Sequence, residues 1–264
     1  MIIDIHTHTF PDALAARAVA ALAEKAQVPA LTDGTNAGLR ASMRQAGIDL
    51  SVVAPIATKP SQVRAINAWA AEVNRAGDGL LALGTLHPAL TDWGVEINRL
   101  VADGIPGIKM HHDYQDAFVD DPTQFPMFHA LAEAGRFILL HAGVDIGLPP
   151  PVHCTPERLA RVLDAVPELV VIAAHMGGYA QWDAVEAYLV GRNLYFDTSY
   201  SQVDLGAARF TALIRSHGPA RILFGTDSPW TDPATELASL RALPLPADQL
   251  AAITGGNAQQ LLNR

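Results

Sequence analysis

The sequence opens with Met1-Ile2-Ile3-Asp4-Ile5-His6-Thr7-His8, a stretch whose pattern returns along the whole chain. Its isoleucines form a short apolar run typical of a buried strand, and the run ends in two histidines two positions apart. Because side chains alternate between the faces of a strand, we expect His6 and His8 to project from the same side at its carboxyl end. Two imidazoles on one rigid element make half of a metal site, so the rest of the chain must supply the other ligands.

Strands and helices are expected to alternate after this first strand. Further apolar runs predict strands at residues 51–56, 80–86, 107–110, 136–140, 169–174, 194–198 and 222–226. Helices are expected at residues 13–26, 37–46, 61–76, 93–102, 126–134, 157–165, 182–190 and 207–217, and two closing helices at 235–243 and 248–253.

Apolar strands joined by helices indicate a parallel sheet whose outer face is covered. Eight such units in a chain near the ~250 residues typical of the architecture predict one (β/α)8 TIM barrel over residues 1–264, with extra helices at its C-terminus. An open doubly wound sheet is the alternative. It would ordinarily carry a glycine-rich phosphate loop after its first strand, and this chain has none.

Composition and charge narrow the class of protein. Half of the residues are hydrophobic and 17% are charged, which is typical of a globular chain. The formal net charge of −9 argues against a broad nucleic-acid or membrane surface. No apolar run approaches the ~20 residues of a membrane span, and the first strand leaves no room for a signal peptide. We therefore expect a cytoplasmic protein that binds a small molecule, able to form a homo-oligomer, with no nucleic-acid or membrane partner.

Polar side chains end five of the predicted strands. They are His6 and His8 on the first strand, Lys109 on the fourth, His141 on the fifth, His175 on the sixth and Asp227 on the eighth. In a TIM barrel the carboxyl ends of the strands surround one mouth, where the chemistry takes place. Imidazoles and a carboxylate suit zinc and similar divalent cations, so the sequence predicts a divalent-metal site with zinc as the favoured ion.

These motifs resemble the amidohydrolase superfamily, in particular its short amidohydrolase 2 branch of metal-dependent hydrolases and decarboxylases. The resemblance covers nearly the whole chain. It rests on His6-Thr7-His8, Gly107-Ile108-Lys109-Met110-His111, Ala174-His175-Met176-Gly177-Gly178, Gly225-Thr226-Asp227-Ser228-Pro229 and Gly255-Gly256-Asn257-Ala258. The segment around Asp227 is also similar to TatD-type nucleases. Those nucleases carry a glutamate at the end of the fourth strand, where this chain has Lys109.

Lys109 bears on the number of metal ions that the resemblance implies. In two-metal members a carboxylated lysine bridges the ions, with the first two histidines and Asp227 on one ion and His141 and His175 on the other. A lysine buried among cations has a lowered pKa and can take up carbon dioxide. In one-metal members His141 joins the first histidine pair and Asp227 as a ligand, and His175 is catalytic. An unmodified Lys109 would then bind a substrate anion. One and two ions per chain both stay open.

Hydrolysis of an amide, ester or lactone is the leading predicted reaction. The metal would lower the pKa of a bound water, Asp227 would accept the water's proton, and His175 would ligate a second ion or stabilise the oxyanion. The alternative is nonoxidative decarboxylation of the kind catalysed by aminocarboxymuconate-semialdehyde decarboxylase, which this branch resembles. A TatD-like phosphodiesterase is a third possibility, and the negative net charge of the chain disfavours it. A metal-binding protein without catalysis is the least favoured alternative.

Four further side chains are predicted to bind substrate because of their positions. His111 lies two residues beyond Lys109 on the same face, and Tyr114 and Trp230 lie in loops over the same mouth. His153 lies in the proline-containing loop after the fifth strand. Aromatic rings in such loops form pocket walls or pack against the core, so position alone leaves their roles open.

Overall fold

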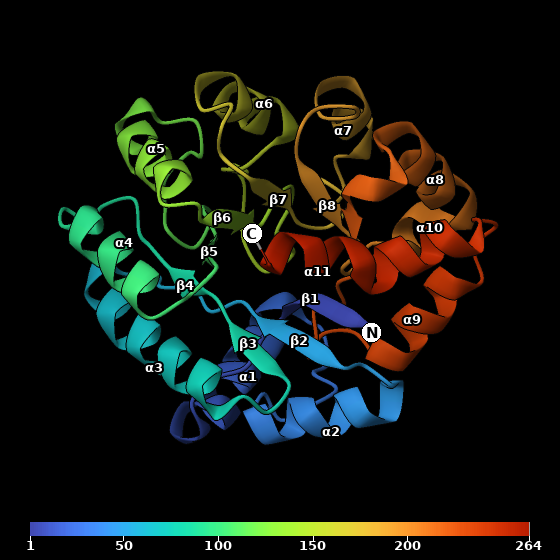
Figure 1. Ribbon diagram of the computed structural model, residues 1–264, viewed down its shortest axis with the longest axis horizontal. Helices are drawn as coiled ribbons and strands as arrows, with labels where there is room; N and C mark the ends of the chain where they lie inside the picture. The colour runs from blue at the N-terminus through green and yellow to red at the C-terminus, as the bar shows by residue number, and fades with distance from the viewer. Residues whose placement is uncertain (264) are drawn as a thin grey trace.

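The computed structural model describes residues 1–263 and shows a ring of parallel strands surrounded by helices (Figure 1). A first sheet has the order β1 (Ile3–Thr7), β2 (Leu50–Val53) and β3 (Leu80–Ala82). A second sheet has the order β4 (Gly84–Thr85), β5 (Gly107–Met110), β6 (Phe137–Leu140), β7 (Val171–Ala173), β8 (Tyr195–Asp197) and β9 (Ile222–Leu223). Neighbours in space are neighbours in sequence, as βαβ units require.

Backbone hydrogen bonds connect the two sheets. The predicted strand at 80–86 is interrupted at Leu83, whose N–H donates to Val53 O at 2.8 Å, so β3 and β4 are two parts of one strand. On the other side Ile5 N–H donates to Phe224 O at 2.9 Å, which joins β1 to the segment after β9. These contacts confirm the predicted (β/α)8 TIM barrel, with its third strand divided in two.

Helices cover the outside of the strand ring (Figure 1). They are α2 (Asn36–Ala46), α3 (Val63–Ala76), α4 (Trp93–Ala102), α5 (Phe125–Glu133), α6 (Pro156–Ala165), α7 (Trp182–Tyr188), α8 (Gln202–His217) and α9 (Pro233–Arg241). A further helix, α1 (Asp12–Ala26), follows the first strand. Two short helices, α10 (Ala247–Ala251) and α11 (Asn257–Leu262), close the chain and are joined by a π-helical turn at residues 252–256. Within the described residues, no helix is both long and apolar enough to pass through a membrane.

The hydrophobic core has two layers, one inside the barrel and one between the strands and the outer helices. The inner layer includes Ile3 and Ile5 of β1 together with Ala258 and Leu261 of α11. The turn before α11 passes so close to the start of the chain that a Cβ at Gly255 would lie 2.1 Å from Met1 O. The last helix therefore closes the amino-terminal end of the barrel, and the carboxyl end is left for a functional site.

Two helices follow β1, and they lie in different places. α2 packs beside α9 in the outer ring. α1 instead lies on the side of the barrel opposite α11, which crosses the near side of the ring in Figure 1. α1 therefore covers the carboxyl end of the strands, where the predicted site residues gather.

Candidate active site

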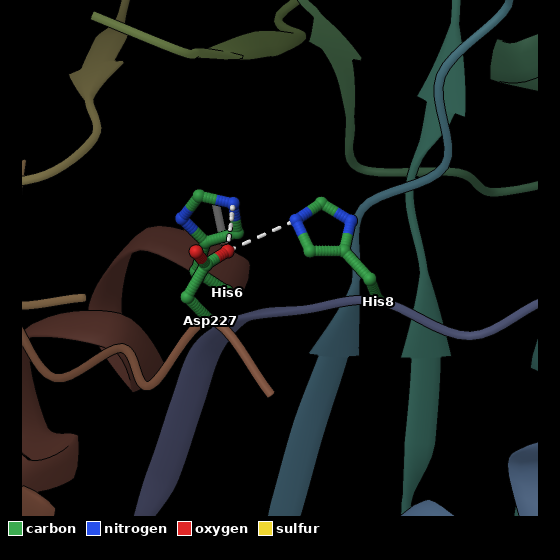
Figure 2. Close-up of side chains that lie close together, drawn as sticks. All are labelled: His6, His8 and Asp227. Atoms are coloured by element: carbon green, nitrogen blue, oxygen red, sulfur yellow. Dashed lines mark hydrogen bonds and ion pairs between the residues drawn. The ribbon is translucent and has the colours of Figure 1, made fainter. Parts of the chain in front are cut away.

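One cluster at the carboxyl end of the barrel joins His6, His8 and Asp227 (Figure 2). Asp227 follows the last strand, and its N–H donates to His6 O at 2.8 Å, which holds the two segments together. Asp227 Oδ1 lies 3.1 Å from His8 Nε2 and 3.5 Å from His6 Nε2. Asp227 also has a left-handed backbone with φ of 66°, a strained conformation that often marks a functional position.

The Nδ1 hydrogen bonds of the two imidazoles turn both Nε2 atoms toward Asp227, where they can act as ligands, although His6 Nε2 also lies 2.9 Å from Lys109 Nζ. His6 Nδ1 donates to Asp197 Oδ2 at 3.0 Å, and His8 Nδ1 donates to the carbonyl oxygen of Ala54 at 3.1 Å. Each ring then presents an unprotonated Nε2 toward Asp227. Lone pairs and a carboxylate that face one another at this range repel unless a proton or a cation lies between them, so the donor set fits a divalent ion.

The acids of this cluster are held in their ionised form. Burial opposes ionisation of Asp227. When the neighbouring histidines are protonated, the hydrogen bond from His8 and the charges of His6 and His175 outweigh burial and hold the pKa of Asp227 well below the ordinary value. The pKa of Asp197 is likewise lowered, because the charge and hydrogen bond of His6 outweigh burial. Ionised carboxylates are the form that ligates a metal ion or orients a ligating histidine.

Lys109 is the buried cation of the site. Only 1% of the residue is exposed, and its Nζ lies 2.9 Å from His6 Nε2. Burial lowers its pKa to about 8, although the negative charges of Asp197 and Asp227 oppose the shift. Lys109 can therefore serve either as a cation for a substrate carboxylate or, once deprotonated, as a nucleophile for carbon dioxide.

A second group lies beside the first and contains His111, His141 and Asp145. His111 Nε2 lies 2.9 Å from Asp145 Oδ2, and the rings of His111 and His141 are stacked at 4.0 Å with an angle of 8° between their planes. The lone pairs of two stacked rings lie in separate, nearly parallel planes. At least one of the two histidines would therefore have to tilt before one ion could lie in the planes of both rings.

His175 connects the two groups. Its Nδ1 donates to the carbonyl oxygen of Ser199 at 3.0 Å, so its Nε2 faces His141 Nδ1, 3.1 Å away. His141 Nε2 is buried and has no hydrogen-bond partner among residues 1–263. Burial, followed by the charges of His111 and His175, lowers the pKa of His141 well below the ordinary value. A neutral His141 with a free nitrogen is a ready ligand or hydrogen-bond acceptor.

Eight of these side chains line one cavity of about 600 Å³. Its polar end is formed by His6, His8, Lys109, His111, His141, Asp145, His175 and Asp227. The other walls are mainly apolar and aromatic. Lys109 is the one lysine or arginine side chain among the described residues that line it.

The sequence pattern of the amidohydrolase family matches residues 3–264. The chain belongs to this family. The match covers nearly the whole sequence and agrees with the motifs that predicted it. No functionally curated protein matches the sequence.

Several solved structures have the same barrel fold as this chain. A TIM-barrel protein from Bordetella bronchiseptica is 22% identical with a TM-score of 0.79, covering 99% of this chain and 98% of the other. A 5-carboxyvanillate decarboxylase from Sphingomonas paucimobilis is 18% identical, with a TM-score of 0.73 and the same coverage. A 2,6-dihydroxybenzoate decarboxylase complexed with 2,6-dihydroxybenzoate is 17% identical, with a TM-score of 0.74, covering 100% and 99%.

The predicted substrate-binding residues fall into two groups. His111, Tyr114 and Trp230 line the cavity. His153 does not line it, because its loop is held against the loop after β5: its N–H and its Nδ1 both face Asp113 Oδ1, at 2.9 and 3.0 Å. His153 is therefore not among the residues that line the cavity, and a role in substrate binding stays a prediction.

The sequence interpretation overlooked two acids of the candidate site, Asp197 and Asp145. Asp197 ends a predicted strand just as the nominated residues do, so the same rule would have found it. Asp145 lies in an irregular loop four residues after His141, and only the folded structure brings it to His111.

Proposed function

We propose that this member of the amidohydrolase family is a divalent-metal-dependent enzyme that removes carbon dioxide from a small carboxylic acid without oxidation. The observation that carries the proposal is Lys109, a buried cation at the polar end of an otherwise apolar cavity. A substrate carboxylate would find its positive partners only at that end, beside the candidate metal cluster. The apolar walls would receive the uncharged part of the molecule.

The residues present fit one divalent ion. His6, His8 and Asp227 would hold it, and the unpaired Nε2 of His141 is available as a further ligand. When bound, such an ion supplies positive charge that orients a carboxylate and stabilises negative charge developing on the substrate. A second ion could bind both His111 and His141 only after their stacked rings move apart or tilt, which favours the one-metal form.

The chain's own groups account for the remaining requirements of the reaction. The bond between the carboxyl carbon and its neighbour breaks, carbon dioxide leaves, and the electron pair left on the neighbouring carbon takes up one proton. Lys109 would bind the carboxylate before this step. His175 lines the cavity and lies within hydrogen-bond distance of His141, and it would take up a proton from solvent on Nε2 and transfer it to this carbon.

Similar solved structures support decarboxylation over the hydrolysis that was the leading sequence prediction. Those of known activity include decarboxylases of 5-carboxyvanillate and 2,6-dihydroxybenzoate. A dihydroxybenzoic acid decarboxylase from Polaromonas, 19% identical, contains bound manganese, so manganese joins zinc as a candidate ion. A small-molecule substrate is part of this proposal, while a cytoplasmic location and a homo-oligomer stay predictions.

The test is to supply carboxyl-labelled aromatic acids to the zinc-loaded and manganese-loaded protein in heavy water. We expect labelled carbon dioxide and one solvent deuteron on the product carbon for each turnover. The Asp227→Asn protein should release none. Hydrolysis of lactones or amides, with no carbon dioxide from any acid, would refute the proposal.

Binuclear hydrolysis is the second candidate, and the group of His111, His141 and Asp145 is what favours it. This form requires two ions per chain and a carboxylated Lys109, for which its pKa of about 8 is suitable. Metal analysis together with intact-protein mass spectrometry separates the candidates. Two equivalents of metal and the added mass of one carbon dioxide on Lys109 would support the hydrolase.

A further inference from the structure

The cavity is much larger than a single aromatic ring requires. An apolar cavity of about 150 Å³ is enough to bind benzene, whereas this one measures about 600 Å³. Most of the additional space lies away from the metal cluster, because the histidine, lysine and aspartate side chains that line the cavity belong to the polar end. A substrate that consisted of one ring and a carboxylate would leave most of the cavity filled with water against apolar walls, which is unfavourable.

The space away from the metal cluster lies between α1 and α3. We call it the apolar arm, and it is lined by Leu14, Leu22, Ala26, Ile56, Ile66 and Trp69. These side chains come from α1, from the segment after β2 and from α3. Thr58, Ser61 and Gln62 also line the cavity there, but they are uncharged, and Gln62 Oε1 already accepts from Thr58 N and Lys59 N.

The arm lies next to solvent but presents apolar groups to it. Leu14 on α1 is 44% exposed, and Ile146, in the loop after β6, is 46% exposed and lines the same cavity. α1 is fixed over the mouth at its other end, where Lys25 Nζ lies 4.9 Å from the centre of the Tyr114 ring. Exposed apolar side chains that converge on a cavity indicate that an apolar ligand covers them.

We propose that the apolar arm binds an uncharged hydrophobic extension of the substrate, such as an alkyl chain or a second aromatic ring, while the acid group of the substrate lies at Lys109. The proposal rests on the proposed function, since the carboxylate at the polar end sets the direction of the extension. It specifies the substrate class as an aromatic acid with a long apolar substituent. Among the described residues that line the arm there is no cation for a second anionic group.

The test measures binding of benzoates that carry a 4-alkyl chain from methyl to hexyl, using calorimetry on the zinc-loaded protein. Each added methylene that is buried should tighten binding about fourfold until the arm is filled. Chains of the same length that end in a second carboxylate should lose this gain. A Kd that does not change with chain length, or no binding by any member of the series, would overturn the proposal.

Two matched variants locate the effect on α3. Ala65 lines the cavity and Ala68 does not, although both are exposed and lie on the same helix. Ala65→Trp should fill part of the arm and remove the gain in affinity between the methyl and hexyl compounds. Ala68→Trp should leave that gain unchanged. Equal behaviour of the two variants would place the alkyl chain elsewhere and overturn the proposal.

Failure of this proposal can be told apart from failure of the proposed function. Binding is measured without turnover, and carbon dioxide release is measured separately. A steep chain-length dependence without carbon dioxide from any acid would support the arm and refute the decarboxylase. Release of carbon dioxide, together with a Kd that does not change with chain length, would support the decarboxylase and refute the apolar arm.

Discussion

Replacing Asp197 by asparagine should lower the metal affinity of the site while the barrel stays folded. The Asp197 carboxylate is fully buried and receives hydrogen bonds on both oxygens. Its Oδ2 accepts from His6 Nδ1, and its Oδ1 accepts from the N–H groups of His175 and Ser199 and from the Ser199 hydroxyl. An asparagine side chain has only one acceptor oxygen, so either the donors at the Oδ1 position or the donor at the Oδ2 position must lose their acceptor.

The size of the effect depends on whether the asparagine oxygen takes the Oδ1 or the Oδ2 position of the native carboxylate. Three donors point at Oδ1 and one at Oδ2, so the asparagine oxygen should take the Oδ1 position and its NH2 group should face His6. His6 Nδ1 must then accept, which moves the ring proton to Nε2 and removes the lone pair that ligates metal. Loss of the carboxylate that accepts a hydrogen bond from a ligating histidine typically lowers metal affinity 10–100-fold, or by about 1.4–2.7 kcal/mol.

The assay is competition for zinc against a fluorescent chelator, with nitrogen NMR to report the His6 tautomer. Asp248→Asn, at an exposed position on α10, is the matched control and should bind zinc as the native protein does. Ser199→Ala keeps the contact between His6 and Asp197 and should have a smaller effect. An Asp197→Asn protein that is folded, yet binds zinc within twofold of the native affinity, would refute this account of the tautomer.

The remaining predictions concern catalysis, pH and metal. Asp227→Asn should leave the circular dichroism spectrum unchanged and abolish turnover, whereas Asp248→Asn should retain it; a fully active Asp227→Asn protein would remove that carboxylate from the mechanism. Burial raises the pKa of Glu236 from 4.5 to about 7, against the hydrogen bond from Gln202, so its contribution to stability is complete below pH 4.5 and is lost as the pH rises toward 7. Relative to the native protein, Glu236→Gln should therefore gain up to about 3 kcal/mol in free energy of unfolding across that range, measured in urea, and a constant difference would contradict the assignment. Removal of metal by a chelator should lower the melting temperature, since an ion at 100 times its Kd stabilises the folded state by about 2.7 kcal/mol; no shift on adding zinc back would argue against the site.

Most of the fold could be predicted because each element carries its own local signal. Apolar runs gave the strands and longer segments between them gave the helices, and the barrel followed from their number and order. The interruption at Leu83 has no such signal, because residues 80–86 are almost continuously apolar. The position of α1 was equally hidden. An alanine-rich segment predicts a helix, but it does not tell whether the helix packs outside the barrel or covers its mouth.

The site was predictable where a polar residue ended an apolar strand. The six nominated metal-site residues line one cavity because parallel strands bring their carboxyl ends together. Residues in irregular loops could not be placed in this way. Asp145 was overlooked, and His153 lies outside the cavity lining, because their positions depend on hydrogen bonds to distant segments, which the strand pattern does not record.

Metal binding and the role of Lys109 are linked by a single atom, His6 Nε2. In the structure this nitrogen lies 2.9 Å from Lys109 Nζ and is the only hydrogen-bond acceptor of that ammonium group among the described residues. If His6 Nε2 ligates a cation, Lys109 loses its acceptor while it stays buried, and a buried ammonium without a partner is costly. It can regain one by binding a substrate carboxylate, or it can give up its charge and take on carbon dioxide. These two outcomes correspond to the one-metal decarboxylase and the two-metal hydrolase, so the state of Lys109 in the metal-loaded protein distinguishes them.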